Sequence, residues 1–127
     1  MIIPVGTTVV MADNKVRAST GSDAASTIIG VVRPKTGGAA MIGNSPLNWQ
    51  GKYLKDSFGE RLRNEDESYQ LNPAFDPDLE YVMRGDRDEW QLTGLLGQIT
   101  IKKGQTMGDR WIKLRDIDAT VELWLVR

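Results

Sequence analysis

Thr27-Ile28-Ile29-Gly30-Val31-Val32 is a continuous apolar run with the length of one β-strand. Such a run, rich in β-branched residues, is typical of a strand that lies in the core. Upstream of it, Thr7 to Ala18 carries two short strand patterns that meet at a turn, which predicts a β-hairpin. Downstream, a short strand is expected between Ala39 and Gly43. Residues 1–46 are therefore interpreted as a β-meander.

The end of the chain, residues 91–127, returns to strand patterns. The segment from Trp90 to Ile101 alternates polar and apolar residues near its end and carries two glycines at which a strand can bend. Trp111 to Leu114 and Thr120 to Val126 are expected to be strands, the second paired inside a sheet. Because no segment shows a sustained helical period, we predict a mainly β fold, a single-domain barrel or sandwich of about seven to nine strands.

The middle of the chain, residues 47–90, has a different composition, with seven of the nine aromatic residues and the densest charges. Gln50 to Asp56 and Arg61 to Gln70 are predicted to pair as a hairpin that forms a protruding arm. Leu71 to Asp78 contains two prolines and is expected to be an extended connection. The predicted organisation is thus one domain, with this arm and connection between the meander and the closing strands.

The aromatic residues of the arm have two interpretations, contacts to partner subunits or packing of the arm on its own domain. Aromatic residues that alternate with charges are more typical of an interface than of a core, which favours subunit contacts. The predicted interface residues are Trp49, Tyr53, Phe58, Tyr69, Phe75 and Tyr81.

Composition excludes several classes of function. The chain has no histidine and no cysteine, which excludes serine, cysteine and zinc hydrolases in their usual forms. The net charge of −1, with basic and acidic residues interleaved, argues against nucleic-acid binding. We expect no membrane-spanning segment, no signal peptide and no cofactor, and the cytoplasm of a host cell is the expected compartment.

Three polar patterns have both a functional and an ordinary interpretation. Asp76-Pro77-Asp78, Asp86 to Glu89 and Asp116-Ile117-Asp118 supply oxygens suited to calcium, but turn and cap chemistry is favoured and no metal site is predicted. Arg84-Gly85-Asp86 matches an integrin-binding tripeptide, with a charged turn favoured instead. The polar groups near aromatic residues that could form an unusual active site, against the favoured solvated face, are Lys52, Lys55, Ser57, Asp88 and Glu89. No catalytic residue is assigned.

Five ordered blocks of sequence resemble a known family: Thr27 to Pro34, Trp49 to Gly59, Leu71 to Pro77, Asp88 to Trp90 and Gly94 to Gln98. The chain is similar to the autoproteolytic intramolecular-chaperone domain at the C-terminus of bacteriophage tail-spike, tail-fibre and neck-appendage proteins. The resemblance implies a homotrimer that aligns three chains so that an upstream fibre stem folds, followed by release through self-cleavage. It also implies a location in the virion or in the cytoplasm of the infected bacterium.

The start of the chain leaves alternatives open. Met1 stands a few residues before the first predicted hairpin, so we expect the upstream cleavage segment to be absent and the chain to be at most a self-cleaving peptidase. One alternative is a free-standing virion protein without catalysis, such as a trimeric capsid decoration protein or a tail protein, with phage capsid or tail proteins as partners. Another is self-cleavage that uses Lys52 or Glu89.

Overall fold

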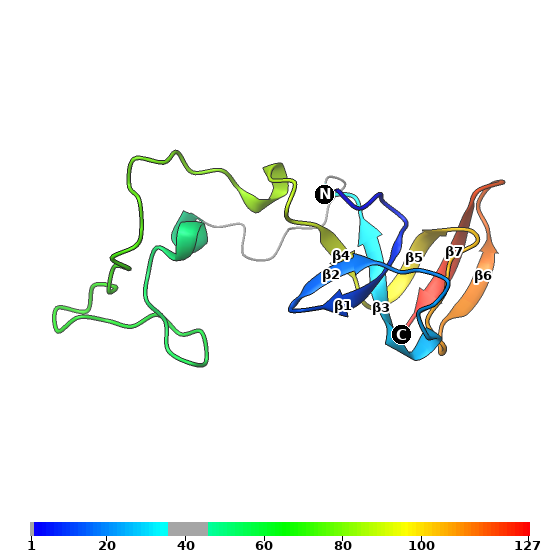
Figure 1. Ribbon diagram of the computed structural model, residues 1–127, viewed down its shortest axis with the longest axis horizontal. Helices are drawn as coiled ribbons and strands as arrows, with labels where there is room; N and C mark the ends of the chain where they lie inside the picture. Colours follow the sequence, from blue (N-terminus) through cyan, green and yellow to red (C-terminus); the bar gives the residue numbers. More distant parts are fainter. Residues whose placement is uncertain (1, 36–45) are drawn as a thin grey trace. The chain divides into compact units, whose positions relative to one another are not determined.

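The computed structural model describes residues 2–35 and 46–127, so the strand expected between Ala39 and Gly43 lies outside the described residues (Figure 1). The chain forms two compact units, one of residues 1–39 with 91–127 and one of residues 40–90. Strands in the described residues belong to the first unit, and short 3₁₀-helices lie at Ala25–Thr27 (η1), Pro46–Gly51 (η2) and Arg84–Asp86 (η3). None of the helices in these parts is long and apolar enough to span a bilayer.

The first sheet has the strand order β2-β1-β3-β4. Its strands are antiparallel neighbours and comprise β1 (Thr8–Ala12), β2 (Lys15–Ala18), β3 (Ile28–Arg33) and β4 (Leu92–Gly94). Asp13 and Asn14 join β1 to β2 with φ values of 50° and 65°, the left-handed conformation that a tight hairpin turn requires. The predicted hairpin is confirmed, and so is the buried strand, since Val31 and Val32 of β3 are 0% and 1% exposed.

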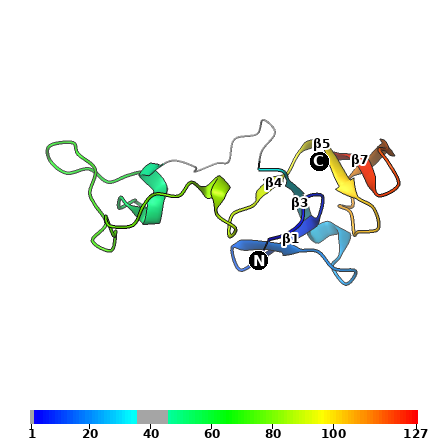
Figure 2. The ribbon, with the colours of Figure 1, turned by 90° about the horizontal axis from the view of Figure 1, so that it is seen from above.

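The second sheet has the order β5-β7-β6. It comprises β5 (Gly97–Lys102), β6 (Ile112–Asp116) and β7 (Val121–Val126), all paired antiparallel. The C-terminal strand β7 is the central one, as its apolar sequence predicted. Figure 2 shows β5 and β7 side by side. The described residues form seven strands in two sheets, which confirms the predicted mainly β class.

One small core joins the two sheets. Val31 of β3 packs with Ile99 and Ile101 of β5 and with Val126 of β7. The backbone of Gly6 strengthens the junction, because its N–H donates to the carbonyl of Val32 (2.9 Å) and its carbonyl accepts from the N–H of Lys102 (3.0 Å).

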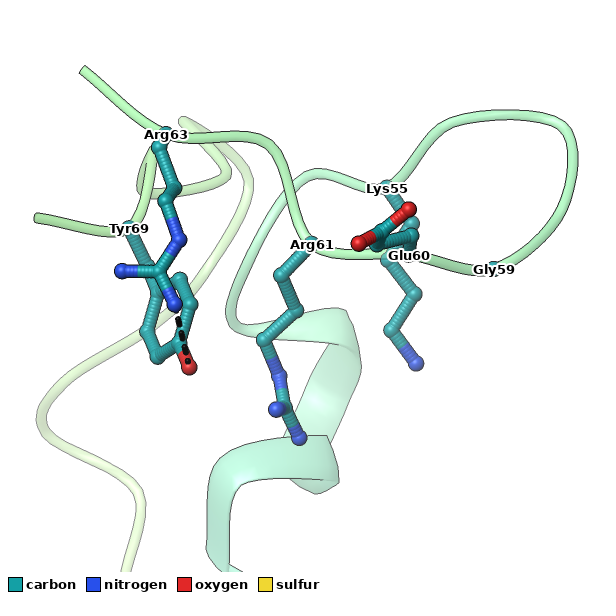
Figure 3. A pocket seen from close by; sticks show the side chains of 6 residues that line it. All are labelled: Lys55, Gly59, Glu60, Arg61, Arg63 and Tyr69. Atoms are coloured by element: carbon teal, nitrogen blue, oxygen red, sulfur yellow. Dashed lines mark hydrogen bonds between the residues drawn. The ribbon is translucent and has the colours of Figure 1, made fainter. Parts of the chain in front are cut away.

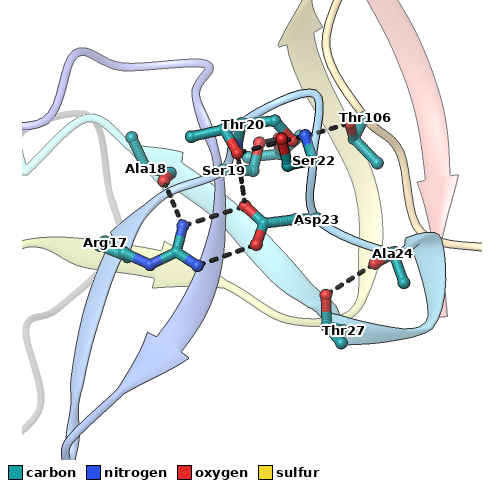
Figure 4. Close-up of polar contacts among 10 residues, drawn as sticks. Arg17, Ala18, Ser19, Thr20, Ser22, Asp23, Ala24, Thr27 and Thr106 are labelled. Carbon is teal, nitrogen blue, oxygen red and sulfur yellow. Dashed lines mark hydrogen bonds and ion pairs between the residues drawn. The ribbon is translucent and has the colours of Figure 1, made fainter.

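The connection between β2 and β3 is held by a charged pair (Figure 4). The guanidinium of Arg17 donates two hydrogen bonds to the carboxylate of Asp23, at 2.9 and 2.8 Å, and the backbone N–H of Thr20 adds a third at 2.7 Å. These donors, Arg17 first, hold the pKa of Asp23 well below its usual range. Thr106 donates to the carbonyl of Thr20 at 3.2 Å, which ties this connection to the segment after β5.

The hairpin predicted for the middle of the chain forms only next to its turn, and its pairing does not continue along the two segments. Three isolated β-bridges occur instead, Lys55 with Arg61, Arg63 with Tyr69, and Tyr53 with Leu71. Lys55 does pair across the predicted turn. However, the segment Arg61 to Gln70 turns back on itself, because Asn64 donates its N–H to the carbonyl of Ser68 at 2.8 Å.

Candidate functional site

Unit two is organised around a closed ring of backbone hydrogen bonds. The N–H of Leu54 donates to the carbonyl of Gln70 (2.9 Å), Gln70 donates to Leu62 (2.9 Å), and Leu62 donates back to Leu54 (3.0 Å). The three residues are eight positions apart, so three short extended segments meet at one point. We call this arrangement the triangle.

Each of the three segments of the triangle runs into a tight turn that begins at an aspartate or asparagine. The turns are closed by backbone bonds from Gly59 to Asp56 (3.1 Å), from Glu67 to Asn64 (3.0 Å) and from Phe75 to Asn72 (3.0 Å). Side chains support them: Asp56 Oδ1 accepts from the N–H of Phe58 at 2.9 Å, and Asn72 Oδ1 accepts from the N–H of Ala74 at 3.0 Å. The sequence signal is therefore Asp56, Asn64 and Asn72 at a spacing of eight, a pattern of turn residues that hydrophobic periodicity does not reveal.

Aromatic and cationic side chains stack on one another beside the triangle. The ring centroids of Tyr53 and Tyr69 are 5.2 Å apart. The ammonium of Lys52 lies 5.4 Å from the centroid of Tyr53 and 5.4 Å from that of Phe75. These three rings are therefore engaged within unit two through cation–π and aromatic contacts.

A second stack lies around Trp49. Tyr81 meets Trp49 edge to face with centroids 5.8 Å apart. The guanidinium of Arg87 lies 4.9 Å from the Trp49 ring, and that of Arg84 lies 3.8 Å from the Trp90 ring. Arg84 is the first residue of the tripeptide that resembles an integrin ligand, and its stacking in η3 supports the interpretation as a charged turn.

Beside the first stack lies a hollow of about 370 Å³, lined by Lys55, Gly59, Glu60, Arg61, Arg63 and Tyr69 (Figure 3). The guanidinium groups of Arg63 and Arg61 lie 4.6 and 5.3 Å from the ring centroid of Tyr69. Arg63 also donates to the Tyr69 hydroxyl (3.4 Å) and to the carbonyl of Glu67 (2.8 Å). Within residues 46–90, neither arginine forms an ion pair with a carboxylate. The hollow can therefore offer positive charge to an acidic group.

The six residues predicted for an interface fall into two sets. Five of them, Trp49, Tyr53, Tyr69, Phe75 and Tyr81, contact other rings or cations inside unit two. Phe58 stands apart, because it is 93% exposed at the tip of the first turn. A phenylalanine this exposed is the clearest apolar anchor for another molecule. The assignment of all six to an interface remains a prediction.

The polar residues considered for an active site have separate surroundings. The ammonium of Lys52 stacks on the rings of Tyr53 and Phe75. The carboxylate of Glu89 pairs with Arg87 at 3.3 Å. We therefore assign no catalytic role to these groups.

The paired aspartates serve as caps and ion-pair partners. Asp76 Oδ1 accepts from the N–H of Asp78 at 2.9 Å, and Asp118 Oδ1 accepts from Thr120 and Val121 at 2.8 and 2.9 Å. These turn hydrogen bonds, that from Thr120 first, lower the pKa of Asp118. In the described ranges, no cluster of three or more potential ligands is arranged to hold a metal ion.

Comparison with known proteins gives consistent matches. The family model described as Peptidase_G2, IMC autoproteolytic cleavage domain, matches residues 1–123. The pre-neck appendage protein of Bacillus phage B103 is 38% identical over 88 residues, which cover 63% of this chain and 10% of that protein. The chain thus spans about a tenth of the length of this relative.

Two solved structures of bacteriophage phi29 gene product 12 share the fold. The C-terminal fragment matches with a TM-score of 0.70 at 29% identity, covering 99% of this chain and 93% of the fragment. The pre-mature gene product matches with a TM-score of 0.74 at 28% identity, covering 99% of this chain and 20% of the larger chain.

Proposed function

The chain belongs to the IMC autoproteolytic cleavage domain family, as its sequence blocks indicated, and we propose that it is the assembly domain of a phage appendage protein. In this proposal three copies associate, and their association brings three upstream fibre stems into register. The observation that carries the proposal is the family match over residues 1–123, together with the likeness to an appendage fragment over almost its whole length.

Self-cleavage then separates the domain from the stem. A domain that acts only while the fibre folds is not needed in the finished appendage, so we expect it to be released after folding. The stem would be found in the virion, whereas the released domain would stay in the cytoplasm of the infected bacterium. The partners are a second and third copy of the chain, the upstream stem and the phage structural proteins to which the appendage attaches.

The surface of unit two supports self-association. Phe58 is 93% exposed, and charged residues surround it along the triangle. An exposed aromatic side chain within a polar rim is the usual composition of an interface centre. We assign Phe58 to the contact itself. Trp49, Tyr53, Tyr69, Phe75 and Tyr81, which contact other rings or cations within unit two, remain further candidates for the interface.

The test joins this chain to the stem of a relative. In phi29 gene product 12, the C-terminal fragment is replaced by residues 1–127, and the fusion is compared with the stem alone. We expect soluble trimeric stems from the fusion and aggregates or single chains from the stem alone, as judged by sedimentation and mass spectrometry. Stems that trimerise equally well without the domain, or fail to trimerise with it, would contradict the proposal.

A matched pair of variants locates the contact. Phe58→Ala in the fusion should reduce the yield of trimeric stems. Met11→Ala, which removes an apolar side chain that is 55% exposed in unit one, should leave the yield unchanged. Equal yields from both variants would remove Phe58 from the interface.

A further inference from the structure

We propose that the hollow at Arg61 and Arg63 receives the acidic turn Glu65-Asp66-Glu67 of a second copy of this chain. The inference rests on the self-association proposed above and names the surfaces that carry it. It follows from the charges on two neighbouring turns of the triangle.

The basic side of the contact is already held in shape. Tyr69 supports both guanidinium groups, at 4.6 Å from Arg63 and 5.3 Å from Arg61. Figure 3 shows the side chains of Lys55 and Arg61 extending to the same side of the ribbon, and Glu60 also lines the hollow. Because stacked guanidinium groups lose little freedom when they bind, they are suited to carboxylate recognition.

The acidic side is an exposed turn held by its own hydrogen bonds. Asn64 and Ser68 close it with a backbone bond of 2.8 Å, and Asp66 Oδ1 accepts from the N–H and the hydroxyl of Ser68 at 3.0 and 2.6 Å. Glu65 and Glu67 are exposed, and in the described part of unit two their carboxylates form no ion pair.

The turn and the hollow of one chain do not pair with each other. Arg63 donates to the backbone carbonyl of Glu67, not to its carboxylate. Glu60 of the same chain also lines the hollow, but neither Arg61 nor Arg63 forms an ion pair within residues 46–90, so both guanidinium groups can take a further carboxylate. A second copy carries a turn of the required charge and shape.

This geometry also determines the kind of assembly. The turn and the hollow are different patches of one chain, so the contact is heterologous and repeats head to tail until a ring closes. A ring of three agrees with the proposed trimer. Exposed ion pairs add little affinity on their own but set orientation, so Phe58, next to the lining residue Gly59, would supply the apolar anchor.

The test uses charge reversal in the full chain, followed by sedimentation over a range of concentrations. The variant E65K/E67K should raise the concentration of half-association at least about tenfold, because each hollow then meets positive charge. The variant R61E/R63E/E65K/E67K reverses both sides and should return to within about threefold of the wild type. The control E80K/D109K changes the net charge as much as E65K/E67K does, at exposed carboxylates outside the contact, and should associate normally.

The outcomes separate this contact from the proposed function. A wild-type chain that stays monomeric at all concentrations would contradict self-association itself. A wild-type chain that associates, with E65K/E67K associating equally well, would leave self-association standing and overturn this contact. If circular dichroism shows that the fourfold variant is unfolded, E65K/E67K alone decides, since both of its substitutions lie on an exposed turn.

Discussion

The side-chain amide of Gln105 forms hydrogen bonds with three backbone groups. Two of them, in Gly6 and Thr8, are nearly a hundred positions away in the sequence, and the third, in Lys102, lies across a turn. The Nε2 of Gln105 donates to the carbonyls of Gly6 (2.7 Å) and Lys102 (2.8 Å), and its Oε1 accepts from the N–H of Thr8 (2.8 Å). Thr8 is fully buried. Gln105→Ala leaves the buried N–H of Thr8 without this hydrogen-bond partner, so we expect the free energy of unfolding to fall by about 1–3 kcal/mol. Denaturant unfolding measures this, with the exposed Gln98→Ala as control, and equal stability of the two variants would contradict it.

Glu67 adopts a left-handed conformation with a φ of 68°. Gly59, at the equivalent position of the preceding turn, has a φ of 82°. A residue with a Cβ is strained in this region by about 1 kcal/mol. Glu67→Gly is therefore expected to stabilise unit two by about 0.5–1 kcal/mol, and Gly59→Ala to destabilise it. Protease resistance of unit two is the measurement, and a Glu67→Gly variant that is cut faster than the wild type would be contrary evidence.

At the scale of elements, β3 and β4 approach closely at Gly30. A Cβ added there would lie 2.4 Å from the carbonyl oxygen of Gly94. Two nonbonded atoms cannot approach this closely, so the backbone would have to shift. Gly30→Ala should therefore loosen the β3–β4 pairing and lower the thermal midpoint. Gly21→Ala, where a Cβ would meet no atom within 4 Å, is the control. A thermal midpoint for Gly30→Ala equal to that of Gly21→Ala would contradict this, because it would show that β4 can move away from β3 without loss of stability.

Strands β6 and β7 share an ionic network whose strength depends on pH. Lys113 lies 2.8 Å from Glu122 and 2.9 Å from Asp116, and Asp116 also lies 3.2 Å from Lys103. Lys113 is the main cause of the lowered pKa of both carboxyls, and its own pKa is raised, chiefly by Glu122.

Carboxyls with a lowered pKa stabilise the fold above their unfolded pKa of about 4, and this contribution is lost as the pH falls toward the folded values. The raised pKa of Lys113 acts in the opposite direction, since its contribution is lost only as the pH rises through that value. The thermal midpoint should therefore decrease between neutral pH and about pH 3, and Lys113→Met should make this decrease smaller. A decrease of the same size in Lys113→Met would contradict the role of the network.

The elements differ in how far the sequence predicts them. Strands β1, β2, β3 and β7 follow from short apolar and alternating patterns, because a half-buried or buried strand needs those residues. The triangle does not follow from such patterns, because it depends on backbone hydrogen bonds between residues eight and sixteen positions apart, such as those of Leu54 with Leu62 and Gln70. Arg61 to Gln70 was predicted to be one strand that returns as a hairpin partner, but the turn at Asn64 interrupts it. Local turn chemistry thus decides the course of the chain here.

At the scale of the whole molecule, the ordered blocks of sequence predicted the family. They did not predict which aromatic residues are exposed enough to contact another subunit. The aromatic residues of the arm were predicted to contact partner subunits. Most of them stack on lysine and arginine within unit two, and Phe58 alone of the six is almost fully exposed. Sequence patterns do not reveal which ring finds a cation, because those contacts join positions brought together only by the triangle.

The most direct test of the central claim is native mass spectrometry of the full chain at micromolar concentration. We predict a species of three times the 14.1 kDa chain mass that decreases when Phe58 is replaced by alanine. A single-chain mass at every concentration would contradict the assembly function.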